Sequence, residues 1–292
     1  MTINSLDQAN NLYERVVPNA IWLCRDWYGL KKLEFEPRES SPLQVRTNST
    51  VKMVADYMMC PWVLYRHSWQ IAELEFAKRV CVGSEPITLI DVGANMGLFS
   101  RQLLVAIPTI ARVFAYEPER ENFACLLHNL APFREKTKLI EAALSNSAGE
   151  AAFYLDPTNS GNYSLAVGAM PPGYTKVIVK TLNAADECST WLQGANRIFY
   201  KSDTEGLDEW VATLLRPEFW PRVVAGIIEL FNIENKPSLD FGGFSSMLNQ
   251  FPNKVFLANP NTKVPEIPVT TADVLNYIKT HAQPHRDLAF WR

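Results

Sequence analysis

The segment Leu89-Ile90-Asp91-Val92-Gly93-Ala94-Asn95-Met96-Gly97-Leu98-Phe99 decides the fold of this chain. Its apolar start is typical of a buried strand, and the two glycines mark a turn that leads into a helix. Glycine allows backbone conformations that other residues avoid and lets a ligand approach the chain closely. Asp91 lies near the end of the strand, where open α/β sheets bind their ligands. We therefore predict a ligand site at this turn, formed by Asp91, Gly93, Ala94, Asn95 and Gly97.

Short apolar runs and helical segments alternate along the chain after this turn. Runs typical of strands occupy 87–92, 113–116, 139–142, 150–155, 176–182, 197–200, 223–230 and 254–257, and helices are expected at about 96–106, 120–130, 205–215, 239–250 and 271–280. Strands that alternate with helices indicate βαβ units. We predict an α/β, Rossmann-like fold with a mostly parallel sheet and helices on both faces. The polar turn at 159–164 is a candidate functional loop, because flanking strands would hold it.

The first 82 residues have a different pattern, so we predict an N-terminal helical region over 1–82 and a ligand-binding domain over 83–292. The region contains four of the eight tryptophans, Trp22, Trp27, Trp62 and Trp69. A helix is expected from about Val51 to Cys81, interrupted near Pro61, because apolar residues recur there at helical spacing. We expect this region to form a lid or wall over a pocket, or a contact in a homodimer.

Composition excludes several classes of protein. The chain has 292 residues, of which 47% are hydrophobic and 20% charged, so it is not a disordered protein. A net charge of −3 and no basic stripe argue against nucleic acid or a membrane surface as a partner. The five cysteines are widely spaced and the four histidines are too few for a structural zinc site. Because no signal-peptide pattern opens the chain, we expect a cytoplasmic protein.

A second acidic residue points to an adenosine-containing ligand. Glu117 ends the strand after the glycine turn, where a carboxylate accepts hydrogen bonds from both ribose hydroxyls. Asn122 would flank the same ligand, and either Glu141 or the backbone of Ala142 would meet the adenine. The Gly-x-x-x-Gly spacing differs from the dinucleotide fingerprint, and Asp91 would repel a pyrophosphate. S-adenosylmethionine carries an ammonium and a sulfonium group, so it suits this acidic turn better.

Four motifs follow one another along the chain: Ile90 to Gly97, Tyr116-Glu117-Pro118, Ala142-Ala143-Leu144-Ser145 with Gly149-Glu150, and Lys201-Ser202-Asp203-Thr204-Glu205-Gly206. Together they resemble the motifs of the FkbM family of S-adenosylmethionine-dependent methyltransferases, and the last motif is similar to that family's signature K-x-D-x-E-G. The resemblance spans about residues 85 to 232 and keeps the order of the family's motifs. It implies a class I methyltransferase fold and, usually, methyl transfer to a hydroxyl oxygen. Polar Ser202 and Thr204 depart from the family's apolar preference.

Three carboxylates are the leading candidates for chemistry at the acceptor. Asp203 is the first choice, Glu205 the second, and Glu229, near the end of a later strand, the third. Such a group would orient the acceptor hydroxyl or take its proton. Together they could hold Mg²⁺ or Ca²⁺, but Lys201 beside them can supply the positive charge instead, so a metal is not favoured. His67 is a further candidate base, because its side chain titrates near neutral pH.

The sequence therefore predicts a methyltransferase that uses S-adenosylmethionine and acts on a hydroxyl group of a small molecule or a sugar. Two alternatives stay open. The first is a nucleotide-dependent oxidoreductase, which would use a similar fold. The second is a methyltransferase-like module that binds a partner and catalyses nothing. The residues do not distinguish one acceptor from another, nor oxygen from nitrogen as the acceptor atom.

Overall fold

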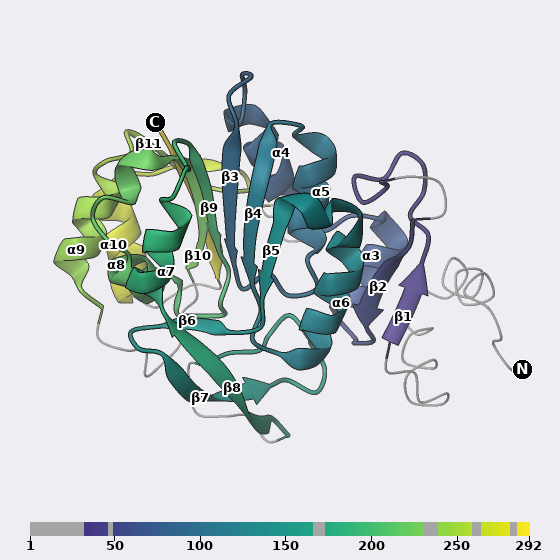
Figure 1. Cartoon of the computed structure of the whole chain (residues 1–292). Coiled ribbons are helices and arrows are strands. Elements are labelled where there is room, and N and C mark those ends of the chain that lie inside the picture. The colour runs from purple at the N-terminus through teal and green to yellow at the C-terminus, as the bar shows by residue number, and fades with distance from the viewer. Residues whose placement is uncertain (1–31, 46–48, 166–172, 231–238, 259–263, 281–284) are drawn as a thin grey trace, which may run out of the picture.

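The computed structural model describes residues 32–45, 49–165, 173–230, 239–258, 264–280 and 285–292. Within these residues a central sheet of eight strands forms the middle layer of the molecule (Figure 1). Its strands, in spatial order, are β12 (Ile267–Pro268), β11 (Asn253–Phe256), β13 (Arg286–Trp291), β10 (Val223–Leu230), β9 (Ile198–Ser202), β3 (Ile87–Val92), β4 (Ile110–Tyr116) and β5 (Thr137–Ile140).

The order of the strands identifies the fold. The five strands from β5 to β10 are parallel and follow the order third, second, first, fourth and fifth along the chain, as in Rossmann folds. Beyond them β13, the last strand, lies antiparallel between β10 and β11. This antiparallel insertion distinguishes the class I methyltransferase fold, which confirms the predicted fold class.

Helices cover both faces of this sheet because its parallel strands are apolar on both sides. On one face Leu89 of β3 packs in a core with α4 (Ile71–Val80), α5 (Leu98–Ala106) and α6 (Arg120–Leu130). On the other face Ile90 and Val92 pack in a second core, which includes residues of four helices. These helices are α7 (Ala184–Trp191), α8 (Asp208–Leu214), α9 (Phe241–Leu248) and α10 (Thr271–Thr280).

A small sheet lies beside the central one, below it in Figure 1. Its strands pair in the order β6 (Ala143–Ser145), β8 (Thr175–Asn183) and β7 (Gly149–Leu155). The sequence predicts most of β7 and β8 but not β6, which is only three residues long. Short 3₁₀ helices at Ala131–Lys136 and Trp220–Arg222 precede β5 and β10.

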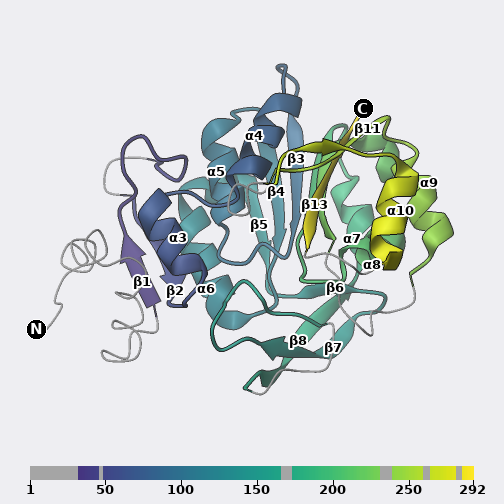
Figure 2. The same cartoon turned by 180° about the vertical axis from the view of Figure 1, so that it is seen from behind.

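The described part of the N-terminal region departs from the predicted helical pattern. Strands β1 (Lys32–Phe35) and β2 (Val51–Val54) pair antiparallel, so the prediction of a helix from Val51 is wrong. Burial in β2 alternates between successive residues, which places Val51 and Met53 in the core and matches a strand period. Figure 2 shows this pair beside α6, on the same side of the molecule as α3 (Met59–Arg66).

The helical part of this region is interrupted after Arg66 and not at Pro61. Proline is tolerated in the first turn of a helix, where its missing N–H needs no partner, and Pro61 lies in the first turn of α3. The break comes where His67 and Gln70 adopt left-handed backbone conformations, with φ of 52° and 47°. The prediction for residues 1–31, which include Trp22 and Trp27, lies outside the described residues.

Candidate functional site

A cavity of about 340 Å³ opens where the parallel strands end, and residues of the small sheet and of α3 and α4 form its other walls. The glycine turn after β3 contributes Gly93 and Asn95 to the cavity wall. The loop of 159–164, a candidate functional loop, contributes Asn159, Gly161 and Tyr163. Met58 and Trp62, which are 51% and 40% exposed, lie at the wall from the side of α3. The cavity thus brings together the segments that the sequence selected separately.

Gly93 is required because two strand ends approach each other closely. Its φ is 75°, and a Cβ atom added there would lie 1.9 Å from the carbonyl oxygen of Asp203. The backbone N–H of Asp203 in turn donates to the carbonyl oxygen of Val92 at 2.9 Å. Glycine at this position therefore keeps the segment after β9 against the turn after β3. We predicted from the sequence that this glycine leaves space for a ligand, but in the structure the nearest atom is the backbone carbonyl oxygen of Asp203.

Two other residues of the turn have packing roles. Gly97 adopts a φ of 75° before α5, and a Cβ atom there would lie 2.4 Å from a methyl carbon of Leu126. It therefore allows α5 to pack closely on α6. Ala94 is buried in the same core. Neither Gly97 nor Ala94 lines the cavity, so the structure does not support their prediction as ligand contacts.

Asp91 lies beneath the turn and not in the cavity wall. It is completely buried, and its Oδ2 accepts a hydrogen bond from Ser100 Oγ at 2.6 Å. Its Oδ1 lies 3.9 Å from Nζ of Lys201. Burial raises the pKa of Asp91, while the Lys201 charge and the Ser100 hydrogen bond oppose that rise. Asp91 does not line the cavity, and its Oδ1 has no hydrogen-bond partner among the described residues. The contact with a cationic ligand that the sequence predicts for Asp91 stays a prediction.

Glu117 lines the cavity directly after the end of β4. It is only 4% exposed, and its two oxygens accept hydrogen bonds from the backbone N–H groups of Asn95 and Glu119, at 2.9 and 2.8 Å. Burial raises the pKa of Glu117 to about 8, although both hydrogen bonds oppose the rise. A carboxylate has about four acceptor positions, so two backbone donors leave capacity for two further hydroxyl donors.

Asn122 and Ala142 also line the cavity, near Glu117. Asn122 Nδ2 donates to the carbonyl oxygen of Ser160 at 3.0 Å, while its buried Oδ1 has no hydrogen-bond partner among the described residues. Glu141 is exposed and does not line the cavity, because β5 ends at Ile140 and the side chain of the next residue lies at the surface. Of the two alternatives for an adenine contact, the structure favours Ala142 over Glu141.

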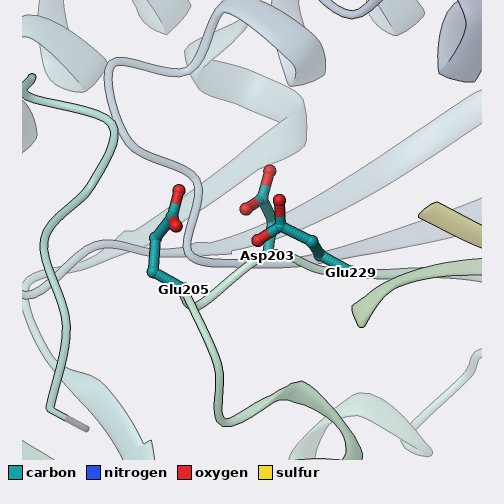
Figure 3. A group of neighbouring side chains, drawn as sticks. All are labelled: Asp203, Glu205 and Glu229. Atoms are coloured by element: carbon teal, nitrogen blue, oxygen red, sulfur yellow. The ribbon is translucent and has the colours of Figure 1, made fainter. Parts of the chain in front are cut away.

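Another part of the cavity is acidic. One carboxylate oxygen from each of Asp203, Glu205 and Glu229 lies within 4.8 Å of the others, and Figure 3 shows the three side chains together. Glu205 lies in the loop before α8, with a left-handed φ of 54°, and not in the helix predicted from 205. We call these three residues the carboxylate triad.

The charges of the triad are unequally balanced. Asp203 Oδ2 accepts hydrogen bonds from Lys201 Nζ at 2.9 Å and from Gln70 Nε2 at 2.7 Å. Burial favours protonation of Asp203, but Lys201 outweighs it and lowers the pKa of this carboxyl. Burial and the neighbouring carboxylates raise the pKa of Glu205 and Glu229 well above the usual range. Asp203 is therefore the ionised member of the triad.

Three polar residues of this part of the cavity were not predicted from the sequence. Gln70 and Glu73 come from the start of α4, and Asp287 comes from β13. Burial raises the pKa of both Glu73 and Asp287. Repulsion from Asp287 adds to the rise for Glu73, and repulsion from Asp203 adds to the rise for Asp287, whereas the hydrogen bond from Glu73 opposes the rise for Asp287. A charged residue on the buried face of an amphipathic helix was a usable signal for Glu73. No signal marked Asp287, because the strand that carries it was not predicted.

His67 is not part of the cavity wall, so its prediction as a base is not supported. Its Nδ1 accepts a hydrogen bond from the backbone N–H of Arg38 at 3.2 Å, and its ring packs edge-on against Phe35, with centroids 5.5 Å apart. These contacts connect the start of the described chain to the end of α3. Among the described residues, no helix is long and apolar enough to cross a membrane.

No protein-family model and no curated protein matches this sequence. Solved structures with a similar arrangement include precorrin-6y C5,15-methyltransferase from Geobacter metallireducens, with 13% identity, 75% of this chain and 87% of that chain covered, and a TM-score of 0.36. A SAM-dependent methyltransferase from Agrobacterium tumefaciens has 10% identity, coverage of 85% and 69%, and a TM-score of 0.37. Methyltransferase FkbM from Methylobacillus flagellatus has 15% identity, coverage of 80% and 52%, and a TM-score of 0.37.

Proposed function

We propose that this protein is an S-adenosylmethionine-dependent O-methyltransferase that acts on a hydroxyl group of a small molecule or a sugar, and that it is a distant relative of the FkbM family. One observation carries the proposal. A single cavity at the carboxyl edge of a class I methyltransferase sheet has Glu117 and Asn122 at one part and the carboxylate triad at another. The first part suits an adenosine, and the second suits a polar acceptor.

The residues around Glu117 fit the adenosine portion of the methyl donor. Glu117 has acceptor capacity left after its two backbone hydrogen bonds, which suits the two ribose hydroxyls. A buried polar atom without a partner costs stability, and Asn122 Oδ1 is such an atom at the cavity wall. A ligand that donates a hydrogen bond to this atom would remove the cost.

The acceptor end can position a hydroxyl group and receive its proton. S-adenosylmethionine supplies a methyl group that its positively charged sulfur already activates. Asp203 is ionised and is held by Gln70 and Lys201, so its carboxylate can accept a hydrogen bond from an acceptor hydroxyl. Positioning contributes about 7–11 kcal/mol in favourable systems, and a general base typically contributes about 10²–10⁴-fold. We therefore expect the rigid hold on Asp203 to matter as much as its basicity.

The oxidoreductase alternative is less consistent with the cavity. A dinucleotide needs a glycine-rich turn whose N–H groups face a pyrophosphate. In this chain Gly97 packs against Leu126, and the carboxylate triad in the same cavity would repel a pyrophosphate. The non-catalytic alternative predicts donor binding without turnover. Buried carboxylates of this kind are costly for a module that only binds a partner.

Calorimetry with S-adenosylhomocysteine and with NAD⁺ tests the proposal. We expect the protein to bind S-adenosylhomocysteine and not NAD⁺, and Glu117→Ala to weaken that binding by roughly tenfold to a hundredfold, since a hydrogen bond to a charged group is worth about 1.5–3 kcal/mol. Glu150→Gln, on the exposed part of β7, is the matched control. Transfer of a labelled methyl group to a panel of hydroxyl and amine acceptors then separates an enzyme from a binding module. Preference for NAD⁺ would refute the proposal.

A further inference from the structure

The carboxylate triad has dimensions that match a cation site. Its three oxygens lie within 4.8 Å of one another. Oxygen ligands surround Ca²⁺ at about 2.3–2.6 Å and Mg²⁺ at about 2.0–2.1 Å, so two ligands on opposite sides of one ion stand about 4–5 Å apart. A single ion between these residues therefore needs little movement of the side chains. All three residues also line the cavity, so an ion there would face its interior.

A second observation points to a ligand at the same place. Glu229 is 7% exposed, and its carboxyl group shares a hydrogen bond with Asp203. Its buried Oε2 atom has no hydrogen-bond partner in the geometry of the described residues. Figure 3 shows its carboxyl group directed toward those of Asp203 and Glu205. A buried carboxylate oxygen without a donor is costly, and in folded proteins such atoms are normally satisfied by a protein group, an ion or water.

Nearby positive charge does not balance the triad. Lys201 Nζ lies 2.9 Å from Asp203 and 3.9 Å from Asp91, so its charge is shared between those two carboxylates. His285 Nε2 lies 3.9 Å from Oε1 of Glu229, and its side chain is half-exposed. Glu73 and Asp287 add two more carboxyl groups to the same part of the cavity. A cation that binds between these residues would favour ionised Glu205 and Glu229, because Lys201 does not offset their negative charges.

We propose that Asp203, Glu205 and Glu229 bind one divalent cation of the oxygen-preferring kind, such as Mg²⁺, Mn²⁺ or Ca²⁺. With three protein oxygens bound, the other coordination positions of the ion face the cavity and are open to water or to an oxygen of the acceptor. In this role, which rests on the proposed function, the ion would hold the acceptor hydroxyl. The site then selects acceptors with an oxygen that can bind the ion.

The other candidate occupant is the ammonium group of an amine acceptor. An ammonium is a hydrogen-bond donor with a single positive charge, whereas a divalent ion supplies two charges at the centre of the triad. Three carboxylates facing one point favour the divalent ion, because it offsets more of their repulsion. The amine is therefore one outcome of the test below, and it would overturn the cation site.

Calorimetric titration of the full chain with MnCl₂, MgCl₂ and CaCl₂, in the absence of any methyl donor, tests the site. We expect saturable binding of one ion for each chain. Glu229→Gln and Glu205→Gln each keep the size of the side chain and remove its charge, and each should weaken binding at least tenfold. Glu150→Gln should bind as the wild type does. Circular dichroism checks that the variants fold.

Two results would overturn the cation site. The first is the absence of saturable binding for all three ions. The second is binding that neither triad variant weakens. A parallel titration uses methylammonium as the probe. If methylammonium binds, if Glu205→Gln and Glu229→Gln weaken this binding, and if no metal ion binds, the site belongs to an amine. Binding of S-adenosylhomocysteine is measured on the same samples. If the protein binds S-adenosylhomocysteine but no metal ion, only the cation site is refuted. If it binds a metal ion but not S-adenosylhomocysteine, only the proposed function is refuted.

Discussion

Adenosine binding is expected to depend on pH through Glu117. This carboxyl group is buried at the cavity wall, and burial raises its pKa to about 8. Glu119 and Asp91 are the neighbouring carboxylates that add to this rise, and the N–H groups of Asn95 and Glu119 oppose it. A ribose that donates hydrogen bonds to Glu117 prefers the ionised form. Binding should therefore lower the pKa of Glu117 and release a proton.

The size of the effect follows from the shifted pKa. Above pH 8 the carboxylate is already ionised, so affinity should be constant. Below pH 8 each unit of pH reduces the ionised fraction about tenfold, which corresponds to about 1.4 kcal/mol of binding free energy. Between pH 9 and pH 6 we thus expect affinity to fall by up to about a hundredfold. The decline stops where pH reaches the pKa of Glu117 in the complex.

Calorimetry with adenosine from pH 6 to pH 9 measures this dependence, and adenosine has no group of its own that titrates in that range. Repeating the titration in buffers with different ionisation enthalpies counts the protons released. Glu117→Gln keeps a hydrogen-bonding side chain that does not titrate, so its pH dependence should disappear. A wild-type affinity that does not change with pH, or a dependence that survives in Glu117→Gln, would refute the assignment of the ribose to Glu117.

Three further predictions concern the turn, the triad and the adenine end. Gly93→Ala should lower the free energy of unfolding by several kcal/mol, of which about 1–2 kcal/mol comes from the positive φ and the rest from the overlap with Asp203. Gly194 has a φ of 74° and open space around it, so Gly194→Ala should lower that free energy only by the contribution of the positive φ. Urea unfolding of both variants measures the difference. Asp203→Asn should reduce kcat by at least about a hundredfold and change the affinity for S-adenosylhomocysteine by less than threefold; equal effects on both would contradict a role at the acceptor. Asn122→Ala should weaken that affinity by roughly tenfold, while Glu141→Ala, at the surface, should leave it unchanged when both are measured by calorimetry.

Local sequence patterns were sufficient for the elements of the parallel sheet. The predicted limits of β3, β10, α6 and α10 coincide with those in the structure, because buried strands and amphipathic helices leave distinct periodicities in the sequence. Glu117 and Asp203 were found for the same reason, since residues at the ends of parallel strands meet at one edge of a sheet. The pairing partners of those strands did not have to be known.

Tertiary structure alone decided the rest of the site. Asp287 belongs to a strand that inserts antiparallel between β10 and β11, and no local pattern reveals where a terminal strand inserts. Asp91 and Gly97 fit a ligand-binding motif, yet Lys201 and Leu126, which are distant in sequence, occupy the space around them. A short motif specifies backbone conformation and side-chain type. Which neighbour each side chain contacts depends on packing between segments that are far apart in the chain.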